Sequence, residues 1–226
     1  MIIDKVFVIN LAHRVDRKNK IISELEKVGI TNYEIFKAIK PTEDMIEKWN
    51  PNFLNPIPEW FKKTGGDETK YKIGSLGCML SHYQIIKLSF ERNYNNVLIL
   101  EDDTEFQLQK GITFDILLDL LKKQLDNLDF GLLYLAGNHR GSQIKKHSNN
   151  IIKVKGTLTT GSYVINKSVM KYILDNIIGF VREIDVYYSM IIQSKFPCYC
   201  IYPHVTFQGE GYSDIVQKNV SYKLNL

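Results

Sequence analysis

A short apolar run that ends in three acidic residues constrains this chain more than any other feature. Val97 to Leu100 is continuously aliphatic, and Glu101, Asp102 and Asp103 follow at once. Unbroken aliphatic runs of this length are typical of strands that are covered on both faces. Open α/β sheets bind their ligands beyond the carboxyl ends of such strands. The run therefore predicts a carboxylate cluster at the ligand-binding edge of a sheet.

The charge of this cluster has two readings. Three adjacent carboxylates repel one another, so the arrangement costs free energy unless a cation neutralises it. Mg²⁺ and Mn²⁺ prefer oxygen ligands of this kind, which favours a metal site. A solvated acidic turn, or a helix that begins with acidic residues, explains the same motif equally well.

Strands and helices alternate along the chain. We expect strands at 6–11, 33–39, 97–100, 132–135 and 199–207, with two short ones on either side of 156–161. Helices are expected at 15–28, 42–49, 75–92, 114–128, 168–178 and 184–193, with Ser75 as the N-cap of the third. The proline-containing segment 51–70 and the polar segment 137–150 are predicted to be loops. The order predicts an α/β sandwich with a largely parallel central sheet and a single domain over 1–226.

Composition excludes several classes of function. The formal net charge of +4 is mild, and the basic runs are short, so a nucleic-acid-binding protein is not expected. No segment approaches the roughly 20 apolar residues of a membrane span, and the first ten residues do not resemble a signal peptide. We therefore expect a soluble, cytoplasmic protein. Cys78, Cys198 and Cys200 lack the usual zinc or redox spacing and are predicted to be buried free thiols.

A second polar cluster follows the first predicted strand. Asn10 to Arg17 contains Arg14 and Arg17 at a strand-to-helix turn, where amide donors and guanidinium groups suit an anion or a nucleotide. Alternatively, Asp16 caps the helix and both arginines are solvated. The chain has neither a GxGxxG nor a GxxxxGK[ST] motif, which disfavours a dinucleotide enzyme or a P-loop ATPase.

These motifs, taken in order, resemble glycosyltransferase family 25. The resemblance rests on Asn10-Leu11-x-x-Arg14-x-Asp16-Arg17, then Gly74-x-x-Gly77-Cys78-x-x-Ser81-His82, then Ile99-Leu100-Glu101-Asp102-Asp103. It continues through Thr160-Gly161-Ser162-Tyr163, Glu183-Ile184-Asp185 and Tyr202-Pro203-His204, and ends near Gly211-Tyr212-Ser213-Asp214. Each motif alone is weak, whereas the ordered set is specific.

The resemblance implies a GT-A-type fold and a nucleotide-sugar donor, with inversion of the anomeric centre during a Mn²⁺-dependent transfer. Glu101 and Asp103 have the spacing of the DxD metal motif, and residues i and i+2 of an extended segment point to the same side. Mn²⁺ or Mg²⁺ would be held by Asp103, Glu101 and His204. The residues expected to bind the donor, a UDP-sugar, are Asn10, Leu11, Arg14, Arg17, Ser81, His82, Asp102, Gly161 and Ser162.

Asp185 is the candidate catalytic base, because it matches an aspartate of the family pattern, although it could equally cap a helix. The transferred sugar would be a hexose, galactose or glucose, and the acceptor a hydroxyl group on a glycan or on a hydroxylysine-type side chain. Two alternatives stay open at this point. One is a nucleotide-sugar pyrophosphorylase or nucleotidyltransferase, and the other is a non-catalytic module that binds a nucleotide sugar or a glycan. The sequence leaves the oligomeric state undetermined.

Overall fold

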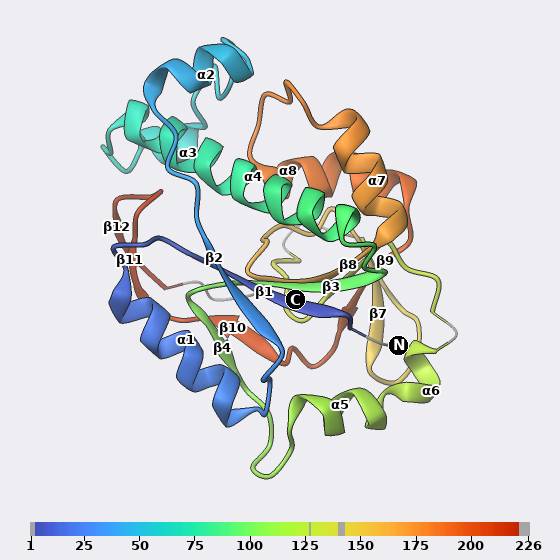
Figure 1. Ribbon diagram of the computed structural model, residues 1–226. Coiled ribbons are helices and arrows are strands. Elements are labelled where there is room, and N and C mark those ends of the chain that lie inside the picture. Colours follow the sequence, from blue (N-terminus) through green and yellow to red (C-terminus); the bar gives the residue numbers. More distant parts are fainter. Residues whose placement is uncertain (1–2, 127, 140–142, 222–226) are drawn as a thin grey trace.

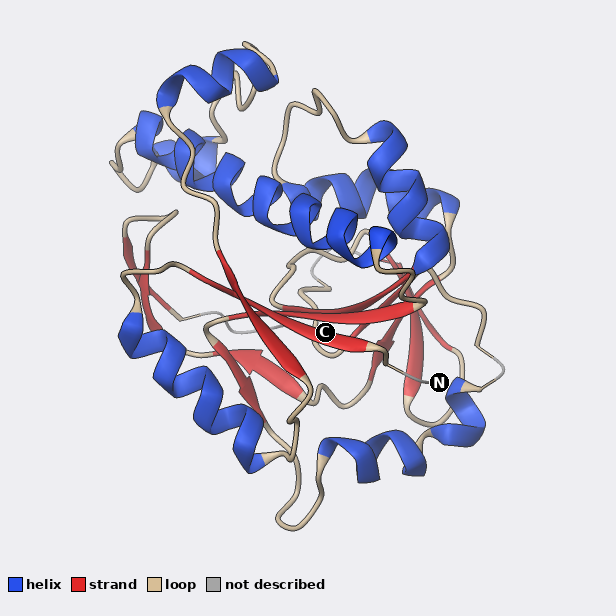
Figure 2. Ribbon diagram, viewed as in Figure 1, coloured by secondary structure: helices blue, strands red, loops and turns tan. Residues whose placement is uncertain are grey.

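The computed structural model of the chain describes residues 3–126, 128–139 and 143–221, in which a sheet lies between two layers of helices (Figures 1 and 2). The outermost parts of the expected 1–226 domain, residues 1–2 and 222–226, lie outside the described residues. In the described chain the central sheet has eight strands in the order β2-β1-β3-β8-β5-β9-β7-β6. Their bounds are Tyr33–Lys37, Lys5–Asn10, Asn96–Glu101, Ser162–Asn166, Leu132–Tyr134, Cys198–Ile201, Ile151–Lys155 and Gln143–Lys146, in that order.

The sheet is mixed, but most of its strands run in one direction. β1 is parallel to β2 and β3, and β5 is parallel to β9. β8 is antiparallel to its neighbours β3 and β5, and β7 to its neighbours β9 and β6. Among the described strands, β8 and β7 therefore run against the other six. The predicted α/β fold with a largely parallel central sheet is confirmed.

Both faces of the sheet are covered by helices, as the aliphatic run in β3 predicts (Figure 1). Val97 and Ile99 belong to the apolar cluster on one face, and Leu98 and Leu100 to the cluster on the other. The first face is covered by α2 (Glu43–Trp49), α3 (Glu59–Lys62), α4 (Glu68–Glu91), α7 (Lys167–Asn176) and α8 (Ile184–Tyr187). A π-helical turn (Tyr188–Ile192) and α9 (Gln193–Lys195) continue α8. The second face is covered by α1 (Val15–Lys27), α5 (Phe114–Leu120) and α6 (Lys122–Leu125).

The long helix α4 begins earlier than the sequence suggests. Its N-cap is Asp67, whose carboxylate accepts a hydrogen bond of 3.0 Å from the backbone N–H of Lys70. Ser75, the expected cap, lies within the helix, so the prediction of a loop over 51–70 is wrong at its carboxyl end, and α3 also falls inside it. The nearby glycine permits close packing: a Cβ on Gly77 would lie 2.7 Å from the backbone carbonyl oxygen of Ile39.

Three further segments differ from expectation. The helix predicted at 114–128 divides into α5 and α6 at Leu121, and residue 127 lies outside the described part. The segment predicted to be a polar loop contains strand β6, although residues 140–142 are not described. The strand predicted at 199–207 is two strands, β9 and β10 (Thr206–Gln208).

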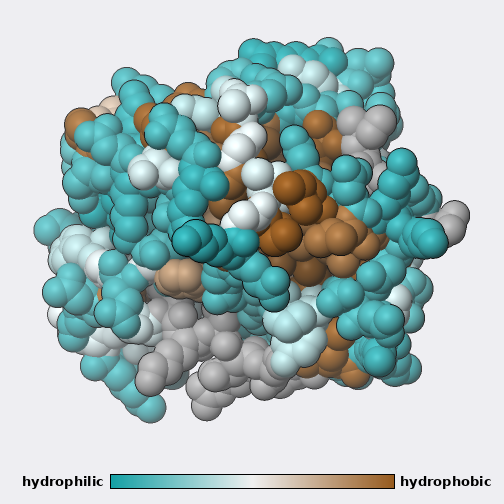
Figure 3. Space-filling view, turned by 90° about the horizontal axis from the view of Figure 1, so that it is seen from below, coloured by the Kyte–Doolittle hydropathy of each residue, from teal (hydrophilic) through white to brown (hydrophobic). Residues whose placement is uncertain are grey.

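Two small sheets complete the fold. β10 pairs antiparallel with β4 (Thr104–Phe106), which directly follows the acidic cluster, and β11 (Gly211–Ser213) pairs with β12 (Lys218–Val220). Seen from below, the surface is mostly hydrophilic around an apolar area (Figure 3). α5, which lies on this side, exposes Ile116 and Leu120 by 42% and 67%. No described helix combines the length and the apolar character that crossing a membrane requires.

Candidate functional site

The acidic cluster lies at the sheet edge where three strand ends meet. Asn10 is the last residue of β1, Glu101 is the last residue of β3, and Ser162 is the first residue of the oppositely directed β8. The pairing of Ile9 with Glu101 and of Leu100 with Ser162 brings these ends to the same edge. Residues that are more than 60 positions apart in sequence thus surround the three carboxylates.

Glu101 is surrounded by hydrogen-bond donors. Thr160 Oγ1 donates to its Oε1 at 2.8 Å, and Gln208 Nε2 donates to its Oε2 at 3.4 Å. His82 Nε2 lies 3.4 Å from Oε1, while His82 Nδ1 lies 2.8 Å from the Tyr163 hydroxyl group. Burial alone would raise the pKa of Glu101, but the contacts with His82 and Thr160 outweigh it and lower the pKa. Glu101 is therefore an ionised carboxylate near neutral pH.

The polar partners of Asp102 lie at the end of β1 and in the first turn of α1. Asn10 Nδ2 donates to it at 2.7 Å and Arg17 Nη1 at 2.9 Å. Burial raises the pKa of Asp102, although these two donors oppose the effect. Asp102 therefore anchors Asn10 and Arg17 at the sheet edge.

Asp103 shares one neighbour with Glu101. Gln208 Nε2 lies 3.5 Å from Asp103 Oδ1 and 3.4 Å from Glu101 Oε2, so one amide group contacts both carboxylates. Burial, followed by the charge of Glu101, raises the pKa of Asp103 to about 7. Arg17, 3.3 Å away, compensates in part. Arg17 alone therefore does not neutralise the charge that Asp103 and Glu101 carry together. Their hard oxygen atoms suit Mg²⁺ or Mn²⁺.

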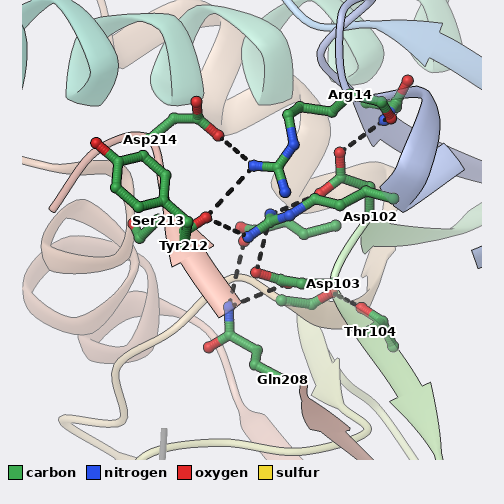
Figure 4. Close-up of polar contacts among 12 residues, drawn as sticks. Arg14, Asp102, Asp103, Thr104, Gln208, Tyr212, Ser213 and Asp214 are labelled. Carbon is green, nitrogen blue, oxygen red and sulfur yellow. Dashed lines mark hydrogen bonds and ion pairs between the residues drawn. The ribbon is translucent and has the colours of Figure 1, made fainter. Parts of the chain in front are cut away.

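The hairpin of β11 and β12 contacts both arginines of the first turn, and Figure 4 shows Arg14 beside Asp214. Arg17 Nη2 donates to the backbone carbonyl of Tyr212 at 2.9 Å, and Arg14 Nη1 donates to Asp214 at 2.8 Å. Arg14 also forms two hydrogen bonds with Asp16, of 3.1 and 2.9 Å. The predicted anion-binding turn therefore contacts carboxylates and a carbonyl group of its own chain.

Asp185 lies in the first turn of α8, whose N-cap position is occupied by Glu183. Its Oδ1 accepts from the backbone N–H of Val186 at 2.8 Å, and its Oδ2 from that of Thr159 at 3.4 Å. Burial and the charge of Glu183 raise the pKa of Asp185 to about 6. Thr159 Oγ1 donates to Gln208 Oε1 at 3.2 Å, so two residues connect Asp185 with the acidic cluster.

Other residues that were expected to bind a donor mostly contact the protein's own backbone or side chains. Leu11 accepts a backbone hydrogen bond of 2.8 Å from Arg14. The Ser81 hydroxyl group donates to the Gly77 carbonyl at 2.6 Å and accepts from the Ile39 N–H at 2.8 Å, which ties α4 to the segment after β2. The Ser162 hydroxyl group lies 2.6 Å from Thr206 Oγ1.

Gly161 lies where Gln208 crosses the sheet edge. A Cβ at position 161 would lie 3.1 Å from Gln208 Cγ, so the glycine leaves room for that side chain. A small cavity here is lined by Thr104, Ala136, Thr159, Gly161, Ser162, Phe207 and Gln208. No motif marks Gln208 in the sequence; it reaches the site because β10 pairs with β4.

The structure groups His204 with other residues than Glu101 and Asp103. Among the described residues, the ligand atoms of His139, Cys200 and His204 all lie within 4.8 Å of one another, and no such group joins His204 to the two carboxylates. Glu101 forms another group with Cys78 and His82. The expected three-ligand set of Asp103, Glu101 and His204 is thus not brought together in this structure.

Comparisons with known proteins agree with the sequence motifs. Over 143 residues the chain is 32% identical to procollagen galactosyltransferase 1-B of Xenopus laevis, a match that covers 60% of this chain and 21% of that protein. A glycosyltransferase 25 family member of Aedes aegypti is 29% identical over 108 residues, which cover 46% of this chain and 17% of that protein. Procollagen galactosyltransferase 2 of Homo sapiens is 24% identical over 201 residues, or 86% of this chain and 31% of that protein. The chain therefore spans less than a third of the length of these relatives.

A solved structure supports the fold. A UTP-bound UGPase from Acinetobacter baumannii matches with a TM-score of 0.50 at 12% identity, over 92% of this chain and 88% of that one. At this identity the likeness concerns the fold alone. Residues 3–188 match the family described as glycosyltransferase family 25 (LPS biosynthesis protein). Since the match extends over more than half of the sequence, the chain belongs to glycosyltransferase family 25.

Proposed function

We propose that the chain is a metal-dependent, inverting glycosyltransferase that moves a hexose, galactose or glucose, from a UDP-sugar to a hydroxyl acceptor. One observation carries the proposal: Glu101 and Asp103 both contact Gln208 at the sheet edge, beside Arg17. Hard oxygen ligands and a guanidinium group at one position are what a metal-bound diphosphate requires. The membership of family 25 supports the same conclusion.

Asp103 and Glu101 are the residues that would hold Mn²⁺ or Mg²⁺. The raised pKa of Asp103 supports this assignment, because a cation stabilises the charged form of a carboxyl group that lies beside another carboxylate. When bound, the ion acts as a Lewis acid and stabilises the negative charge of the departing nucleoside diphosphate. Gln208, which contacts both carboxylates, orients them toward each other.

Arg14 and Arg17 are proposed to bind the diphosphate of the donor. Their present partners are Asp214, Asp16, Asp102, Asp103 and the Tyr212 carbonyl. For Arg17, a phosphate oxygen can replace the Tyr212 carbonyl, because charge-assisted hydrogen bonds to phosphate are stronger than those to a neutral carbonyl group. Arg14 would exchange one anionic partner, Asp214, for another. Asn10 and Asp102 keep Arg17 in place during this exchange.

Asp185 is proposed as the general base that takes the proton from the acceptor hydroxyl group. Its pKa of about 6 lies between that of an ordinary aspartate and neutral pH, so it is ionised at pH 7.5 and more basic than an exposed carboxylate. The acceptor is a hydroxyl group of a glycan or a hydroxylysine-type side chain; the names of the procollagen galactosyltransferase relatives support the latter.

A nucleotide-sugar pyrophosphorylase or nucleotidyltransferase is the second candidate, and the fold shared with a UGPase is the observation in its favour. Such an enzyme would need a glycine-rich, basic loop after its first strand. Residues 11–14 of this chain, Leu-Ala-His-Arg, contain no glycine. A non-catalytic module that binds a nucleotide sugar or a glycan is the third, and the intact acidic cluster and Asp185 argue against it.

A nucleotide-release assay tests the proposal. The full chain is incubated with UDP-, GDP-, ADP- and CMP-sugars, each with Mn²⁺ and again with EDTA, with and without simple hydroxyl acceptors. We expect release of UDP from one hexose donor with Mn²⁺ and none with EDTA. Pyrophosphate-dependent formation of UTP would support the second candidate. Absence of both nucleotide release and calorimetric UDP binding in the presence of Mn²⁺ would refute the transferase proposal.

A further inference from the structure

Three metal-ligating side chains gather outside the donor site. His139 follows β5, Cys200 lies in β9, and His204 lies in the turn between β9 and β10. Their ligand atoms all lie within 4.8 Å of one another. His139 and Cys200 are buried and His204 is half-buried, so the cluster opens toward solvent at His204.

The geometry of the two imidazole rings suits a bound cation. His139 Nε2 lies 3.1 Å from His204 Nε2. Two ring nitrogens at this separation need either an N–H of one ring that donates to the other, or a cation between them, because two facing lone pairs repel. Tetrahedral zinc with Zn–N bonds of about 2.05 Å separates two nitrogen ligands by about 3.3 Å. The observed distance is close to that value before any ligand has moved.

The ring of His139 is held from its other side. Its Nδ1 lies 2.9 Å from Thr157 Oγ1, and Thr157 is fixed in turn by Gln193, which accepts from its N–H at 2.9 Å and donates to its carbonyl at 2.7 Å. A histidine that ligates a metal commonly donates its second N–H to such a partner, which leaves the opposite nitrogen as the ligand. Thr157 therefore orients Nε2 of His139 toward His204 and Cys200.

We propose that His139, Cys200 and His204 bind one zinc-like divalent transition-metal ion, with water in the fourth position. Two imidazoles and one thiolate form a softer ligand set than the carboxylates Glu101 and Asp103, so the two sites select different ions. The Cys200 thiol, which now donates to the Ile201 carbonyl at 3.3 Å, loses its proton to solvent when its sulfur bonds to the metal.

The bound ion joins the segment after β5 to the turn that leads into β10. Hydrogen bonds to the rest of the chain also hold that turn, among them Val205 N–H to the Leu135 carbonyl at 3.1 Å, Gln107 N–H to the Val205 carbonyl at 3.0 Å and Gln107 Nε2 to the His204 carbonyl at 2.8 Å. β10 carries Gln208, which contacts the acidic cluster. The site thus fixes the strand that supplies Gln208, and its existence does not depend on the proposed transferase activity.

Cobalt titration of the chelator-treated full chain tests this site. Co²⁺ bound to a thiolate has a charge-transfer absorption band that carboxylate-bound Co²⁺ lacks. We expect this band to reach its maximum at one equivalent and to disappear when Zn²⁺ is added. Cys200→Ser should abolish the band, and Thr157→Val should weaken binding about 10–100-fold. Cys198→Ser is the matched control, since Cys198 is equally buried in the same strand but lies outside the cluster.

The outcome is decisive even if Cys200→Ser does not fold. His204→Gln, at a half-buried position, should then lower the affinity for Co²⁺ more than 10-fold, whereas Asp103→Asn should leave the band unchanged. A wild-type chain without the band, or a band of equal intensity in the His204→Gln variant, would overturn the proposal. If the wild-type chain shows no band, a hydrogen bond between the two imidazoles accounts for their close approach.

Discussion

Three consecutive acidic residues of this chain have three different electrostatic environments. The pKa of Glu101 is lowered, that of Asp102 is raised, and that of Asp103 is raised to about 7. The differences follow from their partners, because His82 and Thr160 contact Glu101, Arg17 and Asn10 contact Asp102, and Asp103 has the longest polar contacts of the three. A cation is therefore most strongly favoured beside Asp103.

The first prediction concerns this residue. Asp103→Asn should reduce Mn²⁺-dependent transfer by about 100-fold or more, because a ligand of the Lewis-acidic ion is lost. The melting temperature without metal should be unchanged or higher, because the substitution removes one of two neighbouring half-buried carboxylates. Turnover at matched Mn²⁺ concentrations and thermal unfolding measure the two effects.

Glu26→Gln is the matched control for this experiment, since Glu26 is an exposed acid of α1. It should change neither turnover nor the melting temperature. If Asp103→Asn kept the activity of the wild-type chain at limiting Mn²⁺, Asp103 would not be a metal ligand.

Asp185 connects stability with activity. Its pKa is about 6 in the folded chain and near 3.8 when unperturbed. Between these pH values Asp185 is protonated in the folded chain and ionised in the unfolded chain. The free energy of unfolding therefore falls as the pH rises, and above pH 6 the folded state bears the whole penalty of the ionised Asp185. Asp185→Asn should therefore stabilise the chain by about 1–3 kcal/mol at pH 7.5 and hardly at pH 4.

The same substitution should lower kcat by about 10²–10⁴-fold while leaving UDP affinity intact, because the general base is lost. Urea unfolding at the two pH values is compared with that of Asp175→Asn, an exposed acid of α7. A loss of donor affinity in the Asp185→Asn variant would identify Asp185 as a binding residue instead.

At the residue scale, the sequence identifies the acids and arginines of the site but not their partners. Glu101, Asp103, Arg14 and Arg17 are predictable because they follow apolar runs at strand ends. Gln208 is not, since one amide residue in a polar segment has no local signal. The same holds for the contact of His139 with His204, which are 65 residues apart.

At the scale of elements, aliphatic and amphipathic periodicity predicts most strands and helices, whereas the start of α4 was mispredicted. The prolines and glycines of 51–66 indicate a loop, but the loop predicted over 51–70 runs past Asp67, where α4 is capped. The first two turns of α4 carry several polar residues, so apolar periodicity does not mark them. Asp67 could have been recognised as a cap, because aspartate is a preferred N-cap residue.

The boundary of α4 gives the third prediction. Asp67→Ala should lower the free energy of unfolding by about 1 kcal/mol, because the N–H of Lys70 loses its capping acceptor. Ser75→Ala should cost much less, because Ser75 lies inside the helix and alanine has the best helix propensity. Urea unfolding of the two variants compares them directly, and a larger loss from Ser75→Ala would contradict this assignment of the cap.

At the scale of the whole molecule, the sheet order decides which segments meet. The strand order could not be deduced from alternating elements, because β8 enters the sheet between β3 and β5 against their direction. That insertion places Gly161 and Ser162 beside the acidic cluster. The fold class follows from local patterns, whereas the composition of the site depends on long-range pairing.

The fourth prediction concerns the stability of the whole chain. UDP with Mn²⁺, each at about 100 times its dissociation constant, should stabilise the folded state by about 3 kcal/mol and raise the melting temperature by roughly 5–10 °C. UDP with EDTA should have a much smaller effect, because the diphosphate then faces Glu101 and Asp103 without a bridging cation. Differential scanning fluorimetry provides the measurement, and equal shifts with and without EDTA would refute metal-dependent donor binding.

The hairpin of β11 and β12 also has a consequence for biosynthesis. Arg17 and the acidic cluster are translated long before Tyr212, whose carbonyl group contacts Arg17. β10 likewise pairs with β4 across about a hundred residues. Domains begin to fold while the ribosome is still adding residues, but β9, which lies between β5 and β7 in the sheet, is itself translated only shortly before β10. The contacts of Gln208 with the acidic cluster and of the Tyr212 carbonyl with Arg17 therefore form only after residues 206–212 have been translated.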